Sequence, residues 1–216
     1  MVNIDLSAAF DGAAAGVMTA PDAVRGIDIA QTVASNVNMY YNTVRIAGTG
    51  GAGFGTSALS IASNNPVFRL QNNIFVNKAS GTAIAMRRAA TSTAANYLPA
   101  SSNNLYFAGI PSANNLLFSD AGTPFQTLSG AWVTGGREAN SIGTFDPVFA
   151  SAEDLSDALH LSLNANCDLE SKGVVVGTVT DDIDGEVRNA TTPDIGADEA
   201  LLPKLTIATQ PQSSSA

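Results

Sequence analysis

Charged side chains are scarce in this chain: Asp, Glu, Lys and Arg together make up 13 % of its 216 residues. A helical bundle would carry many such residues on its outer faces, so this shortage disfavours that class of fold. Hydrophobic residues still reach 45 %, which is enough for a buried core and excludes a compositionally disordered chain. Small and uncharged polar residues fill the difference, as is typical of stacked β structure.

Cysteine and histidine each occur once, as Cys167 and His160. A single cysteine cannot form an intrachain disulfide, although large repetitive β folds do not need one. His160 lies between two leucines in an alternating segment, so its ring is expected to face solvent or a loop. We therefore expect neither a histidine-based catalytic triad nor a metal cluster.

Long apolar runs and basic segments are also lacking. No run of about 18 apolar residues predicts a membrane-spanning helix, and no basic segment followed by an apolar one predicts a signal peptide. The chain has 10 basic against 19 acidic residues, a formal net charge of −9. Phosphate binding needs a basic stripe, so nucleic acid is not expected as a partner.

Three asparagines recur at a constant interval. The interval from Asn42 to Asn73 equals that from Asn73 to Asn104, and each asparagine begins a short strand-like segment. Asparagine tolerates the left-handed backbone region, and its amide can bond to the equivalent amide of the next repeat. The equal intervals predict a structural period with an asparagine ladder at one turn. Ordinary exposed turn asparagines are the alternative.

Short alternating segments lie upstream of these asparagines, at residues 26–30 and 58–62. Alternation with period two predicts half-buried strands, and several strands per repeat are what a stacked-coil architecture requires. A looser copy at residues 114–118 breaks the period, so it is either a different strand of the same repeat or chance.

Paired carboxylates are missing from the repeat region. Asp28 is the only acidic residue between positions 25 and 119, whereas a glycosidase needs two carboxylates across the scissile bond. Arg87 and Arg88 open a segment rich in Ala, Thr and Ser, residues 87–103, which is expected to leave the coil as a loop. They are candidates for gripping an acidic glycan, or else they only solvate the loop.

An acidic turn near the C-terminus is a weak candidate for calcium. Asp182 and Asp184, followed by Gly185, have the spacing of the first ligands of a calcium loop. The twelfth position counted from Asp182 is Pro193, which cannot supply the final carboxylate. The favoured interpretation is a tight turn in which Asp184 bonds to nearby backbone, so no cofactor is expected and calcium remains the alternative.

The C-terminal motifs carry a family resemblance. In order they are Asn140-Ser141-Ile142, Asp146-Pro147-Val148-Phe149, Leu159-His160-Leu161, the Asp182 turn with Arg188, and Pro193-Asp194-Ile195-Gly196-Ala197-Asp198-Glu199. This order resembles the C-terminal end of bacterial parallel β-helix repeat proteins of the pectate-lyase-like superfamily. Residues 72–77 resemble the recurring rung of that family.

The resemblance spans residues 25–199 and implies an all-β fold, a right-handed parallel β-helix. Because the family usually shows more coils, it implies a C-terminal fragment of a longer solenoid. Arg188 is expected to pair with Asp194 or Asp198 and to fasten a closing segment that includes Gly196 and Glu199.

The predicted organisation has three parts. Residues 1–24 form an entry segment or partial rung, residues 25–200 the coils and closing segment, and residues 201–216 a linker and the start of an immunoglobulin-like repeat. Residues 205–211 resemble the first strand of such repeats in large surface proteins of Bacteroidota. The resemblance implies an exported, modular parent protein with type IX secretion.

The predicted function is a non-catalytic extracellular module that acts as a stalk, an adhesin or a glycan-binding surface. Polysaccharide, other cell-surface components and the secretion machinery are the expected partners. One alternative is a polysaccharide lyase or glycoside hydrolase domain whose catalytic residues lie outside this chain or in the 87–103 loop. Another is a passive secreted cargo domain.

Overall fold

The computed structural model describes residues 2–5, 20–88, 94–129, 136–143, 145–150, 159–162 and 165–199. The expected linker at 201–216 lies outside the described residues, as do most of the entry segment and residues 89–93 of the expected loop. Within the described parts, no helix is both long enough and apolar enough to cross a bilayer.

The regular secondary structure of the described residues is β-strand apart from one short 3-10 helix, which confirms the expected all-β class. Its elements are β1 (Val2–Asp5), β2 (Val24–Ile29), β3 (Ser35–Tyr40), β4 (Thr43–Gly48), β5 (Gly55–Ile61), β6 (Pro66–Gln71), β7 (Ile74–Ala79), β8 (Thr82–Arg88), the 3-10 helix η1 (Ala94–Asn96), β9 (Leu105–Phe107), β10 (Asn115–Asp120) and β11 (Thr123–Phe125).

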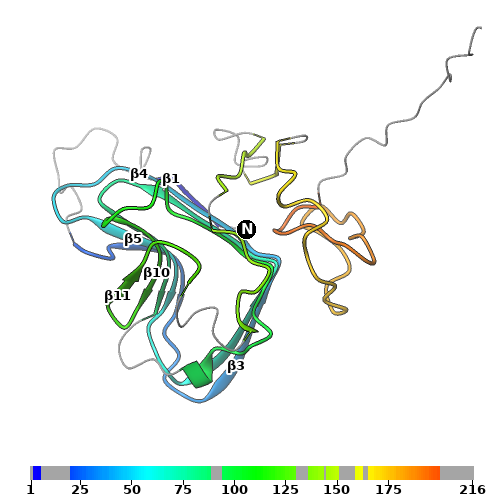
Figure 1. The fold of residues 1–216 in the computed structure, drawn as a ribbon, viewed down its shortest axis with the longest axis horizontal. Coiled ribbons are helices and arrows are strands. Elements are labelled where there is room, and N and C mark those ends of the chain that lie inside the picture. Colours follow the sequence, from blue (N-terminus) through cyan, green and yellow to red (C-terminus); the bar gives the residue numbers. More distant parts are fainter. Residues whose placement is uncertain are drawn as a thin grey trace, which may run out of the picture.

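These strands form three sheets that the chain visits in turn. Sheet A has the order β1-β4-β7-β9, sheet B the order β11-β10-β8-β5-β2, and sheet C pairs β3 with β6. All pairings are parallel except the β10–β11 hairpin. We call one passage through the three sheets a circuit. Successive circuits lie one upon another, as Figure 1 shows for β4, β5 and their neighbours.

The strand register explains which repeats the sequence reveals. In sheets A and C, partners such as Val44 and Phe75, or Val37 and Phe68, keep the same interval along the chain as the three asparagines. In sheet B the interval from Val24 to Thr56 is longer than that from Thr56 to Ala83. Insertions between the sheets therefore hide the period of sheet B. The looser copy at 114–118 belongs to β10 of that sheet, a different strand from β9.

The equally spaced asparagines stack along the sheet A edge. The Asn42 side-chain amide donates to Asn73 Oδ1 at 3.0 Å, and that of Asn73 donates to Asn104 Oδ1 at 2.9 Å. Each acceptor oxygen also receives the backbone N–H of the preceding asparagine, at 3.0 and 2.9 Å. Asn73 and Asn104 are fully buried. The ladder thus joins three circuits through both side chain and backbone.

The left-handed backbone at this corner belongs to the residue before each ladder asparagine. Tyr41, Asn72 and Asn103 have φ of 53°, 59° and 58°. We had attributed this conformation to the ladder asparagines themselves. Their amides instead satisfy the backbone groups that the sharp turn leaves inside; Asn73, for example, donates to the carbonyl of Met39 at 2.9 Å.

Aromatic rings stack in the interior between the sheets. Phe68 and Tyr97 have ring centroids 4.7 Å apart, and Phe75 and Tyr106 have centroids 5.6 Å apart. Each pair joins one circuit to the next, and all four side chains are buried. Such pairs stabilise by about 0.5–1.5 kcal/mol beyond their buried area, so the core and the ladder reinforce the same register.

The described part of residues 142–199 packs beside the circuits, and we call it the C-terminal layer. Ile74 and Val76 of β7 turn away from the main core and pack against Leu169 and Ile195 of this layer. Phe75, between them, points into the main core. The layer (yellow to orange in Figure 1) therefore covers the outer side of sheet A.

Replacement of Asn73 by alanine should destabilise the protein by about 3 kcal/mol or more. The change removes the Asn73 side chain from the Met39 carbonyl and the Asn42 N–H, and it takes one of two donors from Asn104 Oδ1. Each buried group left unsatisfied costs about 1–3 kcal/mol. Urea unfolding measures the difference. Asn114→Ala, at an exposed side chain, is the control, and an equal effect of the two changes would contradict the ladder's importance.

Candidate functional site

Arg87 and Arg88, the candidate glycan-binding pair, point into different surroundings. Arg88 has a side chain only 4 % exposed. Its guanidinium lies 5.5 Å from the centre of the Phe68 ring and donates to Asn96 Oδ1 at 2.9 Å. Burial lowers the pKa of Arg88, and the charge of Asp120 opposes that effect. Arg88 is thus an interior group, so the two arginines do not form a joint binding site on the surface.

Arg87 is partly exposed but already paired. Its Nε lies 3.2 Å from Asp22 Oδ1 and donates to Ser57 Oγ at 3.0 Å. Asp22 also pairs with Arg25 at 2.8 Å, and Arg25 pairs with Asp28 at 2.8 Å. Two acids and two arginines balance in this network, so Asp22 offsets the positive charge that Arg87 would present to an anionic glycan.

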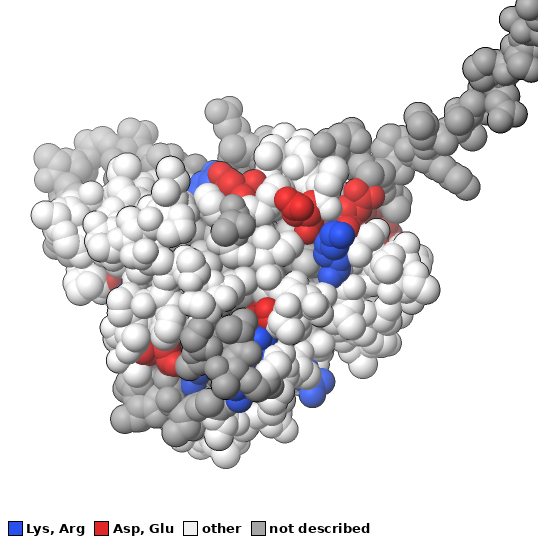
Figure 2. Space-filling model, in the orientation of Figure 1, with Lys and Arg blue, Asp and Glu red and all other residues white. Residues whose placement is uncertain are grey.

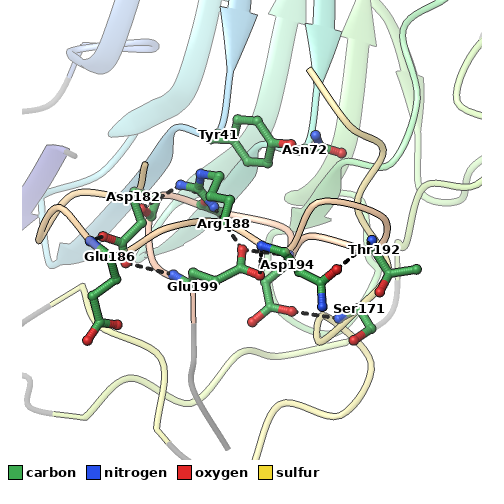
Figure 3. Close-up of polar contacts among 12 residues, drawn as sticks. Tyr41, Asn72, Ser171, Asp182, Glu186, Arg188, Thr192, Asp194 and Glu199 are labelled. Atoms are coloured by element: carbon green, nitrogen blue, oxygen red, sulfur yellow. Dashed lines mark hydrogen bonds and ion pairs between the residues drawn. The ribbon is translucent and has the colours of Figure 1, made fainter. Parts of the chain in front are cut away.

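Arg188 holds the C-terminal layer together. Figure 3 shows it between the Tyr41 ring and the Glu199 carboxylate. Its guanidinium carbon lies 3.9 Å from the ring centre, and Nη1 lies 3.3 Å from Glu199 Oε2. Nη2 donates to the carbonyls of Gly196 and Ala197 at 3.2 and 2.8 Å. The side chain is 4 % exposed, so these contacts are desolvated.

The partner expected for Arg188 was Asp194 or Asp198, whereas the ion pair it forms is with Glu199. Asp194 Oδ1 accepts the Ser171 N–H at 2.6 Å, and Asp198 Oδ2 accepts the Leu161 N–H at 2.8 Å. Both aspartates thus tie backbone segments together. Spacing along the chain could not separate three acids that lie so close in sequence; their orientation follows from the packing of the layer on sheet A.

Gly196 lies where the layer touches sheet A most closely. It has φ of 113°, and a Cβ there would lie 2.5 Å from Ile74 Cδ1. Its N–H donates to the Asn72 carbonyl at 2.9 Å. Asn72 also exchanges side-chain bonds with the Val174 backbone, at 2.7 and 2.9 Å. The Gly196 motif is therefore a site of close backbone approach.

The Asp182 turn uses its carboxylate internally. Asp182 Oδ1 accepts the N–H groups of Asp184 and Glu186 at 2.9 and 2.8 Å, and Oδ2 accepts the Glu199 N–H at 3.0 Å. The residue bonded to nearby backbone is thus Asp182, while we had expected Asp184. Gly185 takes φ of 84°, as a tight turn requires. An oxygen-rich calcium loop would need those Asp182 oxygens for the ion.

His160 lies in a cluster that the alternating pattern did not reveal. Its Nε2 is 2.7 Å from Asp184 Oδ2, and its side chain is 18 % exposed. One potential ligand atom each of His160, Asp184 and Asp198 lies within 4.8 Å of the other two. The sequence did not indicate that these three side chains lie so close together. Burial raises the pKa of Asp198, against the hydrogen bond from Leu161.

A pocket of about 220 Å³ opens next to Arg188. Its walls include Tyr41, Val175, Val179, Val187 and Pro193. Val175 and Val187 are 49 % and 74 % exposed, so this part of the layer presents aliphatic surface to solvent. Figure 2 shows that most of the face drawn carries neither acidic nor basic side chains.

Glu138 is a buried carboxyl below the last ladder asparagine. The Asn104 amide donates to its two oxygens at 3.3 and 3.0 Å, and the hydroxyls of Tyr97 and Ser141 also donate to it. Glu138 is 1 % exposed, and burial raises its pKa against these hydrogen bonds. Glu138 thus accepts the Asn104 amide at the end of the ladder, and Ser141 Oγ accepts the Asn104 N–H at 2.9 Å.

No protein-family model matches this chain, and neither curated proteins nor solved structures gave a significant match. The function must therefore be argued from the geometry alone.

Replacement of Arg188 by alanine should destabilise the protein by about 3–5 kcal/mol, because it leaves the buried Glu199 carboxylate without its cation. Chemical denaturation gives the difference in unfolding free energy. The exposed Lys172, changed to alanine, is the control for loss of one positive charge. Equal stability of Arg188→Ala and the parent protein would contradict the fastening role.

Glu138→Gln should change how stability depends on pH. The raised pKa of Glu138 means that its stabilising contribution is full below its ordinary pKa of 4.5 and is lost as pH rises through the folded-state pKa. The variant has no carboxyl to ionise at this position and so does not lose this contribution. Its unfolding free energy should therefore rise relative to that of the parent protein between about pH 4 and pH 8. Urea unfolding across that range tests it, with the exposed Glu186→Gln as control. A difference in unfolding free energy between Glu138→Gln and the parent protein that does not change with pH would contradict the prediction.

Proposed function

We propose that this chain forms a right-handed parallel β-helix and serves as a rigid, non-catalytic module of an extracellular or cell-surface protein. Three sheets of mainly parallel strands, visited in turn, and an equal interval along the chain between β4 and β7, β7 and β9, and β3 and β6 support the β-helix. The resemblance of the C-terminal motifs to bacterial β-helix repeat proteins supports the extracellular setting. The resemblance of residues 205–211 to repeats of Bacteroidota surface proteins supports export by type IX secretion.

One observation carries the non-catalytic role: the buried charged groups contact the fold itself. Glu138 ends the asparagine ladder, Arg88 packs on interior rings, and Arg188 pairs with Glu199 across the C-terminal layer. Catalytic acids and bases must instead reach a substrate in a cleft. Buried charged groups that bind to the fold itself make the stack of circuits stiff, as a stalk requires.

The distribution of the remaining surface charge favours a stalk over a glycan-binding surface. Asp22, Arg25, Asp28 and Arg87 neutralise one another at sheet B, where β5 separates the strand of Arg25 from that of Arg87. The large hydrophobic side chains exposed in the described residues are all valine or isoleucine, whereas sugar rings stack best on aromatic side chains. An adhesive role would therefore use contacts other than the pair Arg87 and Arg88.

Product release from a panel of plant, algal and bacterial polysaccharides tests the proposal. We expect no new reducing or unsaturated ends above a heat-inactivated control, with or without calcium, while a known lyase in parallel shows that the assay works. Release by this chain would overturn the proposal in favour of a polysaccharide-degrading enzyme. Retention on a polysaccharide that Arg87→Ala abolishes would instead replace the stalk by a glycan-binding surface.

A further inference from the structure

We propose that His160, Asp184 and Asp198 bind a divalent first-row transition-metal ion, zinc above all, within the C-terminal layer. One imidazole nitrogen and two carboxylate oxygens lie within 4.8 Å of one another. Ligand atoms around a four-coordinate zinc ion lie roughly 3 to 4 Å apart. A small movement of the half-exposed Asp184 side chain therefore completes the geometry.

The donor set decides the class of metal. Calcium and magnesium take oxygen ligands almost exclusively, whereas an imidazole together with carboxylates suits zinc and manganese. Asp182, which a calcium loop would need, already uses both its oxygens on backbone N–H groups. The three proposed ligands leave room for water at the remaining coordination positions.

Asp198 is the buried carboxylate among the three proposed ligands. Its side chain is 7 % exposed, so burial has removed most of its water. One oxygen, Oδ2, accepts the Leu161 N–H at 2.8 Å; among the described residues the structure gives the other oxygen no hydrogen bond. An ionised carboxylate has about four lone-pair sites to satisfy, and a cation between Asp198, Asp184 and His160 would satisfy them.

The surroundings hold these ligands in place. The Leu161 N–H orients Asp198, and the Asp182 carboxylate orients the turn that carries Asp184 by accepting its N–H at 2.9 Å. Such outer hydrogen bonds are typical of metal ligands. The ligands come from three separate stretches, residues 159–162, 181–187 and 194–199, so a bound ion would cross-link the layer that packs on sheet A.

Zinc titration of the full, untagged chain tests the site. The protein carries Cys167→Ser, because Cys167 is an exposed thiol that could bind zinc by itself. After removal of metal with a chelator, calorimetry should show one zinc ion bound per chain and much weaker binding of calcium. Zinc should also raise the melting temperature, because an ion that binds only the folded state stabilises it.

Variants distinguish the proposed site from diffuse attraction to acidic surface. His160→Ala and Asp184→Asn should each weaken zinc binding by at least the roughly 10- to 100-fold that loss of an outer-shell partner produces, and should abolish the rise in melting temperature. Glu186→Gln removes one charge from the same exposed turn and should change neither. Asp184→Asn alters a half-exposed side chain, so it tests the site even where a change at buried Asp198 prevents folding.

Two results would overturn the proposal. The first is the absence of saturable zinc binding by the chelator-treated chain. The second is zinc binding that His160→Ala leaves unchanged, or that Glu186→Gln weakens as much as Asp184→Asn does. In either case His160 and Asp184, 2.7 Å apart, form only an ion pair.

Discussion

The stacked amides of Asn42, Asn73 and Asn104 are the constraint on which the rest of this structure depends. Parallel strands can slip against each other, because their hydrogen bonds repeat along the chain. A slip by one residue would exchange the two faces of the sheet. An asparagine that bonds to the same residue of the next circuit through both amide and backbone permits one register only. The stacked rings of the core then follow from that register.

The polar groups at the lower end of the ladder and those on its outer side have different hydrogen-bond partners. At its lower end Glu138 accepts the Asn104 amide, so the stack stops without leaving a buried donor unpaired. On its outer side Tyr41, Asn72 and Asn103 bond to residues 172–174 of the C-terminal layer. One layer thus contacts three successive circuits, and it lies alongside the stack where we had expected a closing segment.

The repeating parts of the fold could be predicted from the sequence. The constant interval between the asparagines was visible because β4, β7 and β9 of sheet A and the two strands of sheet C keep it. In sheet B, insertions make the intervals unequal and so hid the period. The family resemblance indicated the Gly196 motif, whose contacts lie on the distant Asn72 and Ile74. Local chemistry indicated the Asp182 turn, where Asp182 bonds to the nearby backbone. It could not show that Arg88 turns inward, because alternation alone does not say which face is buried.

The partners of the C-terminal layer depend on packing between segments distant in sequence. Arg188 lies within reach of several acids, and its choice of Glu199 follows from the position of Tyr41, far away along the chain. His160 meets Asp184 and Asp198 only because three stretches of the layer converge. No local pattern marks such a meeting, so the candidate metal site could be found only in three dimensions.

Native-state hydrogen exchange tests the central claim most directly. If the ladder holds the circuits in register, the backbone amides of Asn42, Asn73 and Asn104 should exchange together with the buried amides of β4 and β7. They should do so only through unfolding of the whole stack. Exchange of these three amides as fast as that of the exposed turn amides at residues 112–114 would show that the corner opens alone, and would contradict the account.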